Sequence, residues 1–190
     1  MKAAVLVFPG SNCDRDLQTA FEAVGVDVTM VWHKESELPE GIDIVGIPGG
    51  FSYGDYLRCG AIAANSPICT SLKRHVERGG YAIGVCNGFQ ILTETRILPG
   101  ALLRNSGLKY ICKHVPLTVT TTDSIFTQGY EAGASISVPI AHHDGNYQAD
   151  AELQALLGMM PHPERAADEA HGGSDGAAVF TGIVSALVAA

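Results

Sequence analysis

The chain has 190 residues, of which 46% are hydrophobic and 17% are charged, and its net charge is −8 at neutral pH. This length and composition predict a single soluble domain over residues 1–190, and the acidic balance argues against a nucleic-acid partner or an anionic membrane. No apolar run is long enough to cross a bilayer, and the apolar N-terminus stops at Pro9 without a cleavage-type ending, so it is interpreted as a core strand and not as a signal sequence.

The first half of the chain alternates between apolar runs and helical periodicity. Strands are expected over 2–8, 27–31, 42–47 and 81–85, and helices over 14–24, 56–64 and 67–78. Ser11 or Asn12 is expected to cap the first helix. The alternation predicts an α/β fold with a doubly wound, mostly parallel sheet and helices on both faces. Loops beginning at Pro9, Pro48 and Cys86 follow the carboxyl ends of strands and should converge at one rim.

The second half changes character. β-rich segments over 110–122 and 134–140 predict an antiparallel β portion appended to the parallel core. Residues 151–157 are interpreted as helical, residues 159–164 as extended, and residues 177–187 as a terminal helix.

Cys86 is the candidate nucleophile. It follows the apolar strand 81–85 and precedes a predicted helix, and Gly84 and Gly88 flank it at two residues on either side. This spacing is that of a nucleophile elbow, usually described for serine in the pattern G-x-S-x-G. The N-terminus of the following helix favours the thiolate.

His162 is the candidate base. Of the seven histidines, it alone has an obvious partner, because Pro161 and Pro163 favour extended backbone and residues two apart then project together. Glu164 would accept a hydrogen bond from its ring. The alternative is a surface turn with an incidental ion pair.

Backbone amides are candidates for an oxyanion site. Asn87 follows the nucleophile, and glycines 49 and 50 would let amides of the loop 48–51 approach a ligand closely. A plain tight turn or a phosphate cradle is the alternative, although a Walker-type lysine is missing from the sequence.

The five cysteines include no CxxC pair. The odd number and the spacing argue against a disulfide framework and predict no metal site, with a reducing cytoplasm as the compartment. Four of the cysteines receive no role from the sequence: Cys13, Cys59, Cys69 and Cys112.

Segments 8–16, 48–58, 84–90 and 160–165 carry a resemblance to class I (triad) glutamine amidotransferases, which have a flavodoxin-like fold. Within these, the chain resembles the glutaminase subunits of phosphoribosylformylglycinamidine synthases over nearly its whole length. The resemblance implies a Cys-His-Glu triad that hydrolyses glutamine. The residues implied are the catalytic Cys86, His162 and Glu164 and the oxyanion or substrate-binding Gly49, Gly50, Phe51, Asn87 and Gln90.

The resemblance also implies partners. Ammonia would pass to a synthetase subunit of de novo purine biosynthesis that binds ATP and Mg²⁺, with a small accessory subunit also expected. No cofactor is expected in this chain, whose own ligand would be the small molecule glutamine.

Two departures from the family pattern stand out. Residues 141–145 differ from the usual Ala-His-Gly-Glu-Gly, and the stretch between Asp150 and Gly158 lacks a segment that normally helps to deliver the histidine strand. Two alternatives therefore stay open. One is a non-catalytic assembly subunit whose triad is disabled by the shortening after Asp150, and the other is a different cysteine hydrolase on the same fold.

Overall fold

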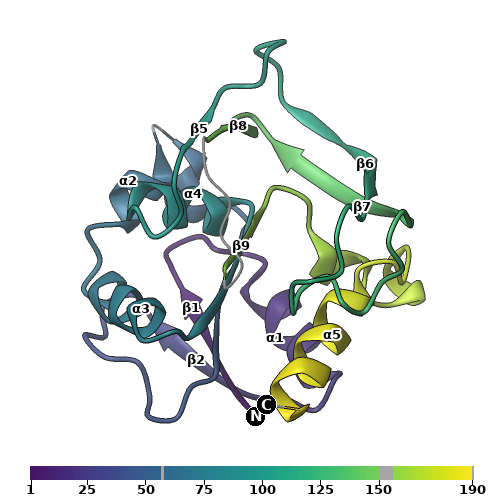
Figure 1. Cartoon of the computed structure of the whole chain (residues 1–190). Helices are drawn as coiled ribbons and strands as arrows, with labels where there is room; N and C mark the ends of the chain where they lie inside the picture. The colour runs from purple at the N-terminus through teal and green to yellow at the C-terminus, as the bar shows by residue number, and fades with distance from the viewer. Residues whose placement is uncertain (57, 150–155, 190) are drawn as a thin grey trace.

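A five-stranded parallel sheet forms the centre of the protein, seen in a computed structural model that describes residues 1–56, 58–149 and 156–189 (Figure 1). The strand order is β2-β1-β3-β4-β9, and every neighbouring pair is parallel. The strands are β1 (Lys2–Val7), β2 (Asp27–Trp32), β3 (Ile44–Ile47), β4 (Tyr81–Val85) and β9 (Leu156–Met159). The predicted doubly wound, mostly parallel sheet is confirmed.

Helices cover both faces of this sheet. Figure 1 shows α1 and α5 together on one side of the strands and α3 and α4 on the other. Because both faces are covered, the central strands are continuous apolar runs, and all four residues of β3 are buried. The helices are α1 (Asp14–Glu22), α2 (Cys59–Ala63), α3 (Ile68–Glu77), α4 (Asn87–Glu94) and α5 (Ala177–Ala189), with short 3₁₀ turns η1 (Ser52–Asp55), η2 (Pro163–Ala166) and η3 (Glu169–His171).

The loops at the carboxyl ends of β1, β3 and β4 meet at one rim, as predicted. The amide of Phe51 donates to the carbonyl of Gly10 at 2.8 Å, and the amide of Cys13 donates to the carbonyl of Gly49 at 3.3 Å. Gly50 has φ = +120°, and a Cβ there would lie 2.3 Å from the backbone nitrogen of Asn12. The first and third strand loops therefore interlock in a way that only glycine permits at this position.

The appended β portion is antiparallel, which also confirms the prediction. Strand β6 (Ile111–Thr118) pairs with β7 (Ser135–His142), and the short β5 (Ala101–Leu103) pairs with β8 (Asn146–Gln148). The sequence pattern missed β5 and β8, which are too short to show a period. Figure 1 shows both pairs in the upper part of the view, away from the chain termini.

Two local predictions were wrong. Neither Ser11 nor Asn12 caps α1, because Cys13 is the N-cap residue and the Ser11 hydroxyl instead bonds the backbone nitrogen and oxygen of Phe8 at 3.0 and 2.8 Å. The helix predicted over 151–157 fails at its C-terminal end, since Leu156 and Leu157 are strand residues paired with β4. Residues 151–155 lie outside the described part of the chain.

The sequence also predicted that no segment is long and apolar enough to cross a bilayer, and the helices of the structure can be compared with this prediction. Over residues 1–56, 58–149 and 156–189, no helix combines the length and the apolar character that a membrane span requires.

Candidate active site

Cys86 lies on a strained turn between β4 and α4. Its backbone angles are φ = 52° and ψ = −108°, a region that residues other than glycine seldom adopt. A Cβ on Gly88 would lie 1.9 Å from the carbonyl oxygen of Ile47, and one on Gly84 would lie 2.7 Å from the carbonyl oxygen of Gly88. The two glycines flanking Cys86 are therefore required by close backbone approach, and the turn has the form expected of a nucleophile elbow.

His162 and Glu164 form a buried pair. The distance between His162 Nδ1 and Glu164 Oε1 is 2.7 Å, and their side chains are 5% and 1% exposed. The residues project together as predicted, but the predicted reason is wrong. Pro163 begins the 3₁₀ turn η2, so the segment is not extended beyond His162. The His162 amide donates to the carbonyl of Pro139 at 2.9 Å, which fixes this turn to β7.

The structure brings Cys86 and His162 together around Gly49. A Cβ on Gly49 would lie 2.7 Å from Cys86 Cβ and 2.9 Å from His162 Cε1, so both side chains pack against the bare glycine. The stretch after Asp150 is short, and β9 nevertheless brings His162 to the elbow. The amide of Cys86 donates to the carbonyl of Met159, the last residue of β9, at 2.8 Å.

Electrostatics favour a protonated His162 ring. Burial lowers the pKa of His162, but the charge of Glu164, together with hydrogen bonds to Cys13, Cys86 and Glu164, outweighs burial and holds the pKa well above its usual value. An imidazolium beside Cys86 would stabilise the thiolate as an ion pair. The carboxylate, the imidazole and the thiol thus have the arrangement that nucleophilic acyl transfer requires.

Asn87 ties the elbow to the loop after β3. Its side-chain oxygen accepts a hydrogen bond from the Ser52 amide at 3.1 Å, and its side-chain nitrogen donates to Asp55 at 2.8 Å and to Gln90 at 2.9 Å. These bonds hold η1 against α4, next to glycines 49 and 50. Phe51 is exposed at the same loop. The oxyanion role of the amides in this region stays a prediction.

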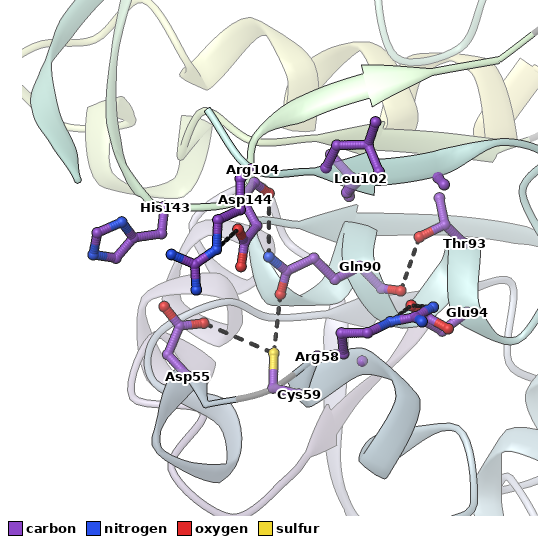
Figure 2. Close-up of a pocket in the computed structure, with 13 residues that line it drawn as sticks. Asp55, Arg58, Cys59, Gln90, Thr93, Glu94, Leu102, Arg104, His143 and Asp144 are labelled. Atoms are coloured by element: carbon purple, nitrogen blue, oxygen red, sulfur yellow. Dashed lines mark hydrogen bonds and ion pairs between the residues drawn. The ribbon is translucent and has the colours of Figure 1, made fainter. Parts of the chain in front are cut away.

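A pocket with a volume of about 380 Å³ opens beside Gln90 (Figure 2). Cys86 is 3% exposed and does not line it. The pocket wall carries charges of both signs. The charged residues that line it are Asp55, Arg58, Glu94, Arg104 and Asp144.

Gln90 is held from two sides, as Figure 2 shows. The Cys59 thiol donates to Gln90 Oε1 at 3.0 Å, and Gln90 Nε2 donates to the carbonyl of Asp144 at 3.3 Å. Burial, followed by the charge of Asp55, raises the pKa of Cys59 to about 12. Cys59 therefore remains a protonated thiol, which makes it a hydrogen-bond donor to Gln90 and a poor nucleophile.

Asn105 is a site residue that the sequence reasoning missed. Its side-chain oxygen lies 3.0 Å from His142 Nδ1 and accepts from the Gly145 amide at 3.1 Å, while its side-chain nitrogen donates to the carbonyls of His142 and Lys109, each at 2.9 Å. Asn105 therefore holds the end of β7 that borders the pocket. Its position in a loop gave no periodic or motif signal.

A family model and full-length relatives match the chain. The model of the CobB/CobQ-like glutamine amidotransferase domain matches residues 1–157. Phosphoribosylformylglycinamidine synthase subunit PurQ of Ruegeria sp. (strain TM1040) is 64% identical over 219 residues, covering 98% of this chain and 99% of that protein. The subunit of the same name from Roseobacter denitrificans is 62% identical over 221 residues and 100% of both chains. The last alignment exceeds the 190 residues of this chain by 31 positions, which agrees with a shortened chain.

A solved structure agrees with the sequence relatives. The structure of PurLQS from Thermotoga maritima matches with a TM-score of 0.92 and 41% identity, covering 98% of each chain. The family model ends before the buried pair at residues 162 and 164, so the full-length matches are what extend the similarity through the whole site. On these grounds the chain belongs to the CobB/CobQ-like glutamine amidotransferase family.

Proposed function

We propose that this chain is the glutaminase subunit of a phosphoribosylformylglycinamidine synthase. Relatives with 64% and 62% identity over their full length carry that subunit name, which supports the assignment. The observation that carries the proposal is the meeting of Cys86 with the buried pair His162–Glu164 around Gly49. A thiol, an imidazole and a carboxylate in this order form a working set for amide hydrolysis.

In the first step, the Cys86 thiolate attacks the side-chain amide carbon of glutamine. A sulfur–carbon bond forms, and negative charge moves to the amide oxygen. Backbone amides around Gly50 and Asn87 are suited to stabilise this oxyanion, because one belongs to a glycine loop and the other begins α4.

In the second step, His162 gives its proton to the leaving nitrogen, the carbon–nitrogen bond breaks, and ammonia departs. His162 then removes a proton from water, which attacks the γ-glutamyl thioester. The carbon–sulfur bond breaks, glutamate leaves, and the Cys86 thiolate and the protonated His162 ring are restored. Glu164 holds the ring through Nδ1, so the other ring nitrogen is left for these proton transfers.

The pocket beside Gln90 is suited to the α-ammonium and α-carboxylate groups of glutamine. Its volume of about 380 Å³ falls in the range of small-molecule sites, and charges of both signs line it. Asp55 and Asp144 would attract the ammonium, and Arg58 and Arg104 the carboxylate. Since Cys86 does not line the pocket, the substrate side chain reaches the sulfur only if the surrounding groups move. A synthetase partner that moves these groups on assembly would raise the activity.

The partner completes the reaction. A separate synthetase subunit would bind ATP and Mg²⁺ and use the ammonia to aminate formylglycinamide ribonucleotide. The match to a chain of the PurLQS structure supports an assembly of this kind. A small accessory subunit is also part of the proposed assembly. The chain itself would need no cofactor, and the cytoplasm is the proposed location.

Glutamate release from glutamine tests the proposal directly. The full chain is assayed alone and with the synthetase subunit, ATP and formylglycinamide ribonucleotide. We expect release that rises on assembly and is lost in Cys86→Ala, while Cys112→Ser, which alters an exposed cysteine on β6, behaves as wild type. Normal glutamate release by Cys86→Ala would refute the assignment.

Labelling separates the enzyme from the non-catalytic assembly subunit. In the assembled complex, a glutamine-analogue electrophile is expected to modify Cys86 and no other cysteine, as mass spectrometry of the digested protein would show. An unreactive Cys86 in a complex that still forms supports the assembly subunit instead. Labelling by electrophiles unrelated to glutamine, but not by the analogue, supports a different cysteine hydrolase.

A further inference from the structure

Cys13 has no part in the mechanism above, yet it lies against the catalytic pair. One ligand atom from each of Cys13, His162 and Glu164 lies within 4.8 Å of the other two, and all three residues are buried. Cys13 reaches this place because it precedes α1 and its amide is bonded to the carbonyl of Gly49. Two thiols, those of Cys13 and Cys86, therefore flank one imidazole.

Glu164 has a carboxylate oxygen without a partner. Oε1 receives the His162 hydrogen bond, whereas Oε2 is buried and accepts no hydrogen bond from the described residues. Leaving a buried carboxylate oxygen unpaired is costly. A cation bound beside this carboxylate would satisfy it, and this observation is independent of the cysteine.

We propose that Cys13, His162 and Glu164 form a Zn²⁺ site. Thiolate sulfur, imidazole nitrogen and carboxylate oxygen are the ligand types that Zn²⁺ takes, whereas Mg²⁺ and Ca²⁺ prefer oxygen alone. Tetrahedral zinc brings its ligand atoms to roughly 3.3–3.8 Å from one another, so a set within 4.8 Å needs a contraction of at most about 1.5 Å.

An approach for the ion opens at Glu164 itself. A second pocket, with a volume of about 880 Å³, is lined there by Glu164 together with Asp16 and Glu169. Arg165, which also lines it, pairs with Asp16 at 3.1 Å. The acidic side chains make this opening attractive to a divalent cation.

Zinc at this site would inhibit hydrolysis reversibly. The ion would occupy both the ring of His162 and the carboxylate of Glu164, and proton transfer needs both groups. This consequence rests on the proposed glutaminase function, whereas the metal site itself does not.

Direct binding of Zn²⁺ tests the site without turnover. The purified full-length chain competes with a chromophoric chelator for Zn²⁺ in the absence of glutamine. We expect one tight ion per wild-type chain, and an affinity at least about tenfold lower in Cys13→Ser. Cys112→Ser is the matched control and should bind as wild type, because Cys112 is exposed on β6. Equal affinities of wild type and Cys13→Ser would overturn the proposal, as would a wild type that binds no ion.

Two further measurements guard against a variant that misfolds. Co²⁺ in place of Zn²⁺ should give the wild type a thiolate-to-cobalt absorption band that weakens in Cys13→Ser and in Cys13→Ala. Excess Zn²⁺ should raise the Tm of the wild type and of Cys112→Ser more than that of either Cys13 variant. Equal cobalt bands and equal Tm shifts in all of these proteins would refute a role for Cys13.

Inhibition is measured separately, so that a failure of the proposed glutaminase function can be distinguished from a failure of the proposed zinc site. We expect Zn²⁺ to inhibit glutamate release, a chelator to restore it, and Cys13→Ser to need about tenfold more Zn²⁺ for the same inhibition. Zinc binding that depends on Cys13 in a chain without glutaminase activity would overturn the proposed function and leave the metal site intact. Glutaminase activity in a chain that binds no zinc would overturn the metal site and leave the proposed function intact.

Discussion

The two sides of the active site are built differently. The Cys86 side is local, since one strand, one turn and one helix adjacent in sequence form the elbow, and two glycines shape it. The His162 side is assembled from distant segments, because β9 pairs with β4, and the His162 backbone is bonded to Pro139 of β7. The elbow should therefore keep its geometry when distant parts of the chain change. The position of His162 depends instead on contacts between segments, and these are lost when any one of the segments is displaced.

Removing the Cys86 sulfur should have the largest effect. Cys86→Ala should lower glutamate release by at least about 1,000-fold, because no other group at the elbow can form the thioester. The fold should persist, since the turn and its glycines remain. Glutamate release and the Tm are measured together. A folded variant that keeps its activity would contradict the role of Cys86 on the elbow as the nucleophile.

Glu164→Gln tests the assembled side. We expect activity to fall roughly 100- to 10,000-fold, because the neutral amide neither orients the His162 ring as the carboxylate does nor stabilises its protonated form. Steady-state glutamate release measures the loss.

The same variant should change how stability depends on pH. The pKa of His162 is raised in the folded state. Its protonation therefore contributes to the free energy of unfolding fully at a pH below the unfolded pKa of 6.5, and this contribution is lost as the pH rises through the folded pKa. Removing the charge of Glu164 should flatten this dependence. Tm values measured upward from pH 6 would show it, and identical profiles for wild type and Glu164→Gln would contradict the coupling.

Gly158→Ala should displace the strand that delivers His162. The added Cβ would lie 2.1 Å from the ring of Phe89 in α4, so the buried Phe89 ring must shift or β9 and the helix must separate. We expect a loss of about 1–3 kcal/mol in the free energy of unfolding, together with lower activity. Gly107→Ala is the matched control, because nothing lies within 4 Å of its Cβ. Equal denaturant midpoints for the two variants would remove β9 packing as the cause.

Asn105→Ala should loosen the pocket border and leave the elbow intact. The change removes four hydrogen bonds, of which two join Asn105 to His142 at the end of β7, one to Gly145 just after it and one to Lys109. The loss should cost about 1–2 kcal/mol of stability and raise the KM for glutamine more than it lowers kcat. Steady-state kinetics separates the two terms. A kcat effect alone would assign Asn105 to the reaction and not to the pocket.

Arg165→Ala should have the smallest effect. Arg165 joins the turn after His162 to Asp16 of α1 at 3.1 Å, but both side chains are substantially exposed. An exposed pair contributes less than about 1 kcal/mol and is screened by salt. A denaturation midpoint that falls far more than this would mean that the surface link, and not β9, holds the assembled side.

Much of the fold was predictable from the sequence because its signals are local. Apolar runs and helical spacing predicted the parallel strands and their helices, and the glycine pattern predicted the turn at Cys86. The errors lie where a tertiary contact decides the outcome. Leu156 and Leu157 are strand residues because β4 offers an unpaired edge, and Cys13 rather than Ser11 precedes α1 because the loop is bonded to the chain after β3.

The sequence by itself determined four of the five strands of the sheet, the elbow and the pairing of His162 with Glu164, because each depends on neighbours along the chain. Only the tertiary structure decided that this pair reaches Cys86, that Cys13 lies beside it, and that Asn105 holds the pocket border. These contacts join segments far apart in the chain, whose distances follow from the packing of the whole sheet and leave no period or spacing in the sequence.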